Sequence, residues 1–185
     1  NDSGMAVANS LIAVESGAVQ VQGTVNGYGE RCGNANLCTI IPNMQLKWNA
    51  SCVPENQIKN LSALSRYVSE LANLAHNERD PYVGHCAFAH KGGMHIDAIH
   101  KNPLSFEHIR PELVGNERRI LMSEVSGRST ILKRIQEVAP WVDKNSYETQ
   151  YLMNELKRLE HEGYQFEGAE TSFELMVRRA LVKND

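Results

Sequence analysis

Residues 23–34 read GTVNGYGERCGN, a glycine-rich segment between two regions of regular hydrophobic pattern. It follows an alternating Val-Gln segment, residues 18–25, which predicts a short strand. It precedes an apolar segment, residues 34–47, which predicts a helix weakened by Pro42. Residues 4–16 carry apolar side chains at helical spacing, so the order is helix, strand, glycine-rich loop and helix. That order predicts an α/β architecture.

The remainder of the chain predicts mostly helices. Helical patterns cover residues 61–75, 129–138, 147–162 and 169–181. The remaining strand candidates are short apolar pieces near residues 86–89 and 119–122. On the helix at 61–75 we expect one apolar stripe to face the core, formed by Leu61, Leu64, Val68, Leu71 and Leu74.

Composition excludes several classes of protein. A chain of 185 residues with 42% hydrophobic content can form one ordinary domain with a real core. A net charge of -3 gives no reason to expect a nucleic-acid partner or an acidic membrane surface. No apolar run approaches the roughly 18 residues of a membrane span. The four cysteines form no CxxC pair, which predicts free thiols in a reducing cytoplasm.

The glycine-rich loop leaves two interpretations open. It reads G-x-G-x-x-x-G, one residue longer than the dinucleotide fingerprint, and no acidic residue follows at the expected distance. One interpretation is a simple turn with a surface ion pair and an Asn helix cap. The other is a loop on the catalytic face of a barrel, where Glu30, Arg31 and Asn34 would be the polar residues available for chemistry.

A second candidate region carries a histidine at every fifth position, at 85, 90, 95 and 100. This spacing fits neither a helix nor a strand, so one regular element cannot direct all of them at one ion. A zinc domain built from these histidines and the cysteines would need ligand spacings that the sequence lacks. His95 follows a Gly92-Gly93 hinge and is the best candidate for proton transfer, whereas His90 is expected to support the loop by a hydrogen bond.

Three stretches together resemble one enzyme family. They are ND-x-G-x-A-x-AN at 1–9, GTVNGYGERCGNANL at 23–37, and FAHKGGMHIDAIHKNP with PELVGNERRILMSEVSGRS between 88 and 129. They are similar to the 2-isopropylmalate, citramalate and homocitrate synthases, which condense acetyl-CoA with a 2-oxo acid. The C-terminal run at 156–181 most resembles the citramalate synthase branch, which uses pyruvate.

The resemblance implies a fold and a domain order. Residues 1–48 would be the end of a TIM-barrel catalytic domain, residues 49–127 linker subdomain I, and residues 128–185 a helical linker subdomain II. The chain would then be the C-terminal fragment of a TIM barrel followed by a mostly helical linker region. The family also implies a cytoplasmic homodimer in which the linker reaches the partner's barrel, without nucleic-acid or membrane partners.

The resemblance also implies site residues. In this family a His-x-His pair directly before the position of Asn1, with an Asp from the first barrel strand, holds a divalent metal. Asn34 matches a further contribution to that metal, which would be Zn²⁺, Mn²⁺ or Mg²⁺, so the chain would carry an incomplete site. Glu30 and His95 match catalytic positions. Glu30 would orient the site, and His95 would enter the neighbouring subunit's active site as part of a proton relay.

One position departs from the family pattern. Many relatives carry a Tyr before a Glu shortly after the histidine, where this chain has Phe106 before Glu107. Phe106 keeps the ring without the hydroxyl, and Ser105 offers a shorter and much less acidic hydroxyl.

The expected function is that of an acyltransferase. It would condense acetyl-CoA with pyruvate to give citramalate by a metal-assisted Claisen condensation, in isoleucine and leucine biosynthesis. Two alternatives stay open. One is a 2-isopropylmalate synthase acting on 2-oxoisovalerate. The other, for the isolated chain, is a dimerisation or linker module without activity of its own.

Overall fold

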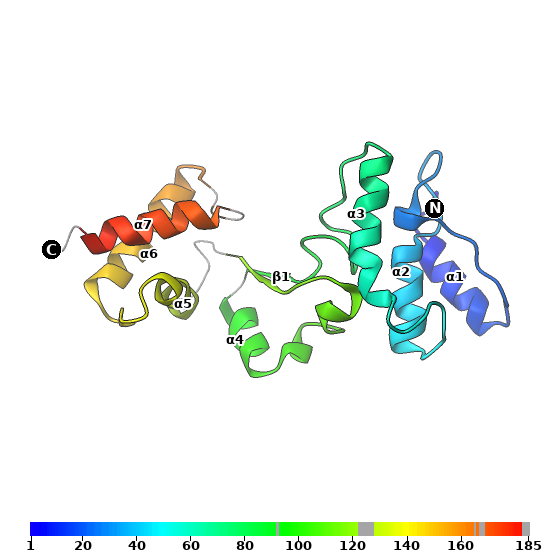
Figure 1. Cartoon of the computed structure of the whole chain (residues 1–185), viewed down its shortest axis with the longest axis horizontal. Helices are drawn as coiled ribbons and strands as arrows, with labels where there is room; N and C mark the ends of the chain where they lie inside the picture. The colour runs from blue at the N-terminus through cyan, green and yellow to red at the C-terminus, as the bar shows by residue number, and fades with distance from the viewer. Residues whose placement is uncertain (92, 122–127, 165, 167–168, 183–185) are drawn as a thin grey trace. The chain divides into compact units, whose positions relative to one another are not determined.

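The computed structural model describes residues 1–91, 93–121, 128–164, 166 and 169–182. The chain divides into two compact units (Figure 1). Unit 1 holds residues 1–88 and 109–118, and unit 2 holds residues 89–108 and 119–185. The domain boundaries expected after residues 48 and 127 refer to the family's full-length proteins and stay a prediction.

Unit 1 consists of short helices joined by long loops. Its elements are α1 (Ala6–Glu15), η1 (Val25–Gly27), α2 (Leu37–Pro42), η2 (Asn43–Lys47), η3 (Ile58–Asn60), α3 (Leu61–Leu71) and η5 (Pro111–Val114). Its core contains Cys38, Leu61, Tyr82, Val83, Phe88, Ile109 and Val114. Core residues therefore come from segments far apart in the sequence.

The prediction of a strand at residues 18–25 is wrong. Among the described residues this segment makes one isolated bridge, between Thr24 and Asn36, and Val19 is fully exposed. An extended segment becomes a strand only when a neighbouring segment pairs with its backbone. The described residues supply such a partner at Thr24 alone. The helix expected at 34–47 is shorter and splits into α2 and η2 around Pro42.

The apolar stripe predicted on the helix at 61–75 is confirmed only in part: Leu61 is buried and Val68 is half-buried. The buried positions of α3 are Leu61, Ser62, Ser65 and Ser69. Leu64, Leu71 and Leu74 are exposed instead. The serines are buried because they have hydrogen-bond partners: Ser62 Oγ donates to the Val114 carbonyl at 2.8 Å. A satisfied hydroxyl can replace an apolar side chain at a packed surface.

Unit 2 combines a minimal sheet with helices. β1 (Ala89–His90) and β2 (Arg119–Ile120) pair in parallel, with Ala89 opposite Arg119, so the strand candidates near 86–89 and 119–122 are confirmed as short pieces. The helices are α4 (Gly93–Lys101), η4 (Pro103–Ser105), α5 (Arg128–Val138), α6 (Tyr147–His161) and α7 (Glu170–Val182).

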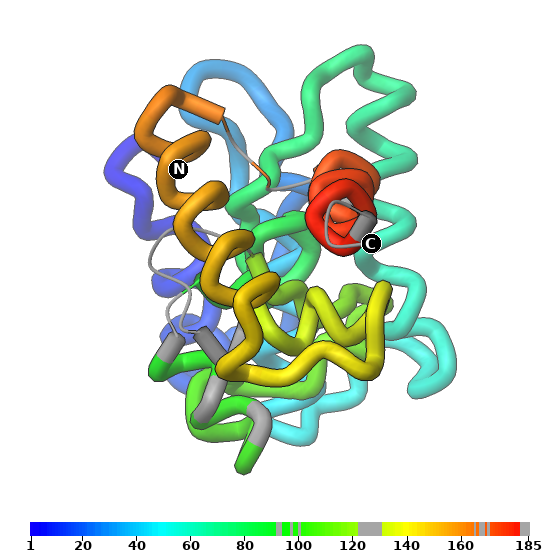
Figure 2. Tube along the Cα trace, turned by 90° about the vertical axis from the view of Figure 1, so that its left-hand side faces the viewer, coloured from blue at the N-terminus to red at the C-terminus, as the bar shows by residue number. Residues whose placement is uncertain are grey.

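The last three helices share the core of unit 2. They follow one another in the chain and are coloured yellow to red in Figure 1 and Figure 2. The core contains Ile131, Ile135, Ala139, Val142, Leu152, Leu156, Phe173, Val177 and Ala180. Ser146 caps α6, since its Oγ accepts a hydrogen bond from Thr149 N at 3.2 Å. The helices predicted from apolar spacing in this part are thus confirmed.

The described chain is therefore mixed but mainly helical, with a two-stranded parallel sheet. None of its described helices is long and apolar enough to cross a membrane. The four cysteines are free thiols, as predicted.

Candidate functional site

The glycine-rich loop of unit 1 is closed by its own backbone. Thr24 N donates to the Ala35 carbonyl at 3.0 Å, and Asn34 N donates to the Gly27 carbonyl at 2.8 Å. Gly33 has φ +81, and a Cβ at Gly33 would collide with the Gly27 carbonyl oxygen. Only glycine fits this position, because it combines a left-handed backbone with a close backbone approach. The loop can therefore keep this geometry only if residue 33 has no side chain.

An asparagine anchors the loop to α3. Asn26, at φ +58, donates from Nδ2 to the Ser65 carbonyl at 2.8 Å and accepts from Ser65 Oγ at 2.6 Å. Tyr28 Oη lies 3.0 Å from Ser69 Oγ. Sequence reasoning missed this network. The serines of α3 at spacings of three and four residues were the available signal, because they form a polar helix face.

Asn34 is exposed on this loop. Its Nδ2 donates to the Tyr28 carbonyl at 3.0 Å, which fixes the amide plane. The described residues provide no hydrogen-bond donor to its Oδ1. Glu30 is exposed on the same loop, and its carbonyl accepts from Gly33 N at 2.9 Å. The structure thus places the sequence-predicted Asn34 and Glu30 on one loop, with a hard oxygen donor open to solvent.

The first residues of the chain reach the same loop. Asn1 N donates to the Gly33 carbonyl at 2.9 Å, and Arg31 pairs with Asp2 at 3.3 Å, both side chains being exposed. The cap of α2 is Asn36, whose Oδ1 accepts from Cys38 N at 2.9 Å. The ion pair and the Asn cap that were expected for a simple turn are therefore both present on the loop that carries Asn34.

His95 lies in unit 2, on α4. The hinge expected at Gly92-Gly93 is only partly described, since Gly92 lies outside the described residues and Gly93 begins the helix. His95 is exposed, and its ring stacks on Phe106 with centroids 4.2 Å apart and planes 27° apart. Ile96 is 2% exposed and anchors α4 next to it. The imidazole is thus accessible, on a helix fixed by its apolar side.

The residues around Phe106 have defined partners. Ser105 Oγ donates to the Asn102 carbonyl at 2.7 Å, so its hydroxyl stabilises the local turn. Glu107 is buried and lies 3.1 Å from His90 Nε2, with side-chain exposures of 1% and 11%. The prediction that His90 supports the loop is confirmed. This buried pair fixes the chain directly beside Phe106.

A third group lies in the loop at residues 77–86 of unit 1. It brings Glu78, His85 and Cys86 together, and Glu78 lies outside the histidine and cysteine positions considered for a zinc domain. In the same loop, burial raises the pKa of Tyr82 to about 12. Burial also raises the pKa of Asp80, against the hydrogen bond from Asn77, which lowers it.

Comparison with known proteins covers most of the chain. A family model described as HMGL-like matches residues 1–68. A second, described as homocitrate synthase post-HMGL domain-like, matches residues 82–163. The first match contains the glycine-rich loop, and the second contains α4 with His95.

Individual relatives agree with these matches. The chain is 55% identical to an (R)-citramalate synthase of Geobacter sulfurreducens over 98% of this chain and 34% of the relative. It is 54% identical to an (R)-citramalate synthase of Synechocystis sp. over 98% of this chain and 33% of the relative. A probable 2-isopropylmalate synthase of Methanopyrus kandleri is 45% identical over 75% of this chain and 27% of the relative. The chain spans about a third of the length of the curated relatives it matches.

Proposed function

We propose, from the premise that this chain belongs to the family of 2-isopropylmalate, citramalate and homocitrate synthases, that its full-length protein condenses acetyl-CoA with pyruvate to give citramalate. The observation that carries the choice of pyruvate is the 54% and 55% identity, over 98% of the chain, to proteins named (R)-citramalate synthase. The named 2-isopropylmalate synthase is 45% identical over 75% of the chain.

The fold of the full-length protein is part of the proposal. Residues 1–48 would complete a TIM barrel, residues 49–127 would form linker subdomain I, and residues 128–185 would form linker subdomain II. Exposed apolar side chains on α1 and α3 and at the residue before α1 support this assignment: Ile12 is 59%, Leu71 69% and Met5 58% exposed. Further barrel elements packed on these helices would cover them.

Asn34 fits the role of a metal ligand. Its amide is oriented by Tyr28, and its Oδ1 is the type of donor that hard divalent cations bind. Asn1 N donates to the Gly33 carbonyl at 2.9 Å, so Asn1 lies against the loop that carries Asn34. The family places its His-x-His ligands directly before the position of Asn1. A divalent cation held by these groups would polarise the ketone of the 2-oxo acid.

The protein's own groups supply the proton steps. His95 is exposed on α4, and an imidazole can act as general acid or general base, so it can take or give a proton during enolate formation and thioester hydrolysis. Glu30, four residues before Asn34, would orient the site. We place His95 in the site of a second subunit, so that a homodimer combines Asn34 of one chain with His95 of its partner.

Phe106 takes the position of the family's Tyr without its hydroxyl. Its ring stacks on His95 at 4.2 Å, so it can orient the imidazole by packing. Ser105 is not a substitute for the phenol in this arrangement, since its hydroxyl donates to Asn102 at 2.7 Å.

The test uses the metal-free full-length protein. We expect CoA release from acetyl-CoA when pyruvate and Mn²⁺, Mg²⁺ or Zn²⁺ are added together, and a lower kcat/KM with 2-oxoisovalerate. A higher kcat/KM with 2-oxoisovalerate would contradict the choice of pyruvate. CoA release at the full rate without added metal would contradict the role of Asn34.

For the 185-residue chain alone, the incomplete metal site favours a linker module without activity. It carries Asn34 but not the His-x-His pair of the family. We expect no pyruvate-dependent CoA release from this chain, and measurable release would contradict this description.

A further inference from the structure

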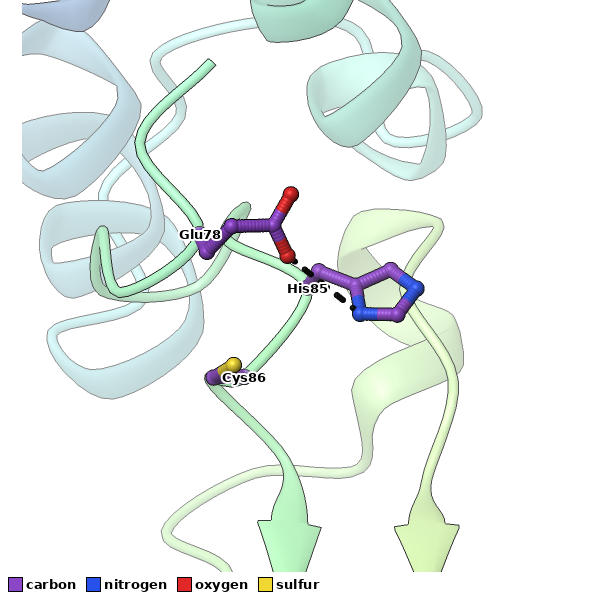
Figure 3. A group of neighbouring side chains, drawn as sticks. All are labelled: Glu78, His85 and Cys86. Carbon is purple, nitrogen blue, oxygen red and sulfur yellow. Dashed lines mark ion pairs between the residues drawn. The ribbon is translucent and has the colours of Figure 1, made fainter. Parts of the chain in front are cut away.

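Three side chains in the loop at residues 77–86 bring different metal-binding atoms together. Glu78, His85 and Cys86 each offer one such atom, and all these atoms lie within 4.8 Å of one another (Figure 3). His85 Nδ1 lies 3.4 Å from Glu78 Oε2. We propose that this Glu-His-Cys cluster binds a divalent cation of the zinc type, separate from the cation expected at Asn34.

The backbone holds the two ends of the cluster together. Cys86 N donates to the Glu78 carbonyl at 2.7 Å, so residues eight positions apart in sequence are fixed side by side. Gly84 N donates to the Asp80 carbonyl at 2.9 Å within the same loop. Backbone hydrogen bonds, and not only the side chains, therefore bring Glu78 close to Cys86.

Two further features fix the loop. A Cβ at Gly84 would lie 2.6 Å from backbone atoms of Glu78 and Asp80, which shows how closely the loop is folded on itself. Asn116 Nδ2 donates to the carbonyls of Tyr82 and Gly84 at 2.8 and 2.9 Å, and Asn116 is buried. Because the backbone is fixed before any ligand arrives, binding costs little ordering of the chain.

The donor set matches zinc chemistry. Zn²⁺ binds Cys sulfur at about 2.3 Å and His nitrogen or carboxylate oxygen at about 2.0–2.2 Å, commonly with three protein ligands and one water. In a tetrahedral site of these bond lengths, neighbouring donor atoms lie about 3.3–3.6 Å apart. The 3.4 Å between His85 and Glu78 already satisfies this. The distances from Cys86 Sγ to the other two atoms are within 4.8 Å, so the thiol has to move closer for all three to bind one ion.

The charges also favour a cation. With the thiol ionised, Glu78 and Cys86 carry two negative charges beside one neutral imidazole, and a divalent cation neutralises them. Binding would release the Cys86 thiol proton to solvent. The side chains of Glu78 and His85 are 61% and 43% exposed, which leaves the cluster open to ions and to a water ligand.

A cobalt titration tests the proposal. Co²⁺ replaces Zn²⁺ in such sites, and a thiolate ligand gives it a near-ultraviolet charge-transfer band that oxygen and nitrogen ligands do not give. We expect this band to saturate by two equivalents in the full-length metal-free protein, since the site expected at Asn34 also takes up Co²⁺. The Cys86→Ser variant should lose the band, and His85→Gln or Glu78→Gln should weaken Co²⁺ binding by more than about tenfold.

Cys52→Ser is the matched control, since Cys52 is an exposed free thiol of the same unit outside the cluster. This variant should keep the band. Absence of the band from the wild-type protein, or its persistence in Cys86→Ser, would overturn the proposal. Because Glu78→Gln keeps the thiol, unchanged Co²⁺ affinity in that variant would also overturn the three-ligand site. Pyruvate-dependent CoA release by Cys86→Ser should equal that of wild type, so failure here is distinguishable from failure of the proposed function.

Discussion

The loop at residues 23–37 and helix α4 hold their candidate site residues, Asn34 and His95, by different kinds of contact. The loop holds Asn34 through backbone hydrogen bonds and through Gly33, where no side chain fits. Helix α4 holds His95 through regular structure and a buried apolar side, and the buried His90–Glu107 pair lies close by in sequence. Adding a side chain at Gly33 should therefore disturb the loop. The α4 region should instead be disturbed by removing a buried side chain such as Glu107.

The largest expected effect is on catalysis through His95. In the full-length protein, His95→Gln should lower kcat by about 10²–10⁴-fold, the usual contribution of a proton-transfer group. The melting temperature should stay unchanged, because the ring is exposed. The same change at His161, an exposed histidine at the end of α6, should leave kcat at the wild-type value. A change of only a few-fold at His95 would point to a structural role.

The next largest effect is on stability through Glu107. Glu107→Ala should lower the free energy of unfolding by about 3 kcal/mol, because it leaves the mostly buried His90 ring without its hydrogen-bond partner. Glu107 has a side-chain exposure of 1%, so solvent does not screen this pair. Urea unfolding monitored by circular dichroism measures the change. A loss below about 1 kcal/mol would show that the buried pair does not fix this region.

Much of the helical framework could be predicted from the sequence. Apolar residues at helical spacing located α1, α5, α6 and α7, because those positions reflect local geometry. The expected hydrogen bond of His90 is also present, between its Nε2 and Glu107 Oε1 at 3.1 Å.

Other features depend on contacts between distant segments. The buried face of α3 is polar because Ser65 meets Asn26, which lies 39 positions away in the sequence. The segment at 18–25 is not a strand, because a strand needs a paired neighbour, which local pattern does not reveal. The Glu-His-Cys cluster forms because the loop returns on itself, and Glu78 stands outside the histidine pattern that drew attention to this region.

A smaller effect is expected at the glycine loop. Gly33→Ala should destabilise unit 1 by about 1–3 kcal/mol, through a left-handed φ and contact with the Gly27 carbonyl oxygen. Gly17→Ala is the matched control, because Gly17 has φ +106 but open space around it, and it should cost less. Chemical denaturation gives both values. Equal costs would mean that backbone strain alone, rather than close packing, shapes the loop.

The smallest effect concerns pH and Asp80. Burial raises the folded-state pKa of Asp80 above its ordinary value of 3.8, so ionisation favours unfolding. This penalty should develop as pH rises from 3.8 through the folded-state pKa, and persist above it. Asp80→Asn keeps an acceptor for Asn77 Nδ2 and removes the charge. Its stability relative to wild type should therefore be higher at pH 7 than at pH 3.5, measured by thermal unfolding. The opposite trend would contradict the raised pKa.

We propose that Asn34 and His95 belong to one active site formed by two subunits. Full-length Asn34→Ala and His95→Gln chains, co-expressed with different affinity tags, can be isolated as a heterodimer and assayed for pyruvate-dependent CoA release. If His95 acts in its partner's barrel, one of the two sites carries both changes and the other carries none. The heterodimer should then retain about half the wild-type rate, although each homodimer is inactive. A heterodimer as inactive as the two homodimers, or failure to form one, would contradict the claim.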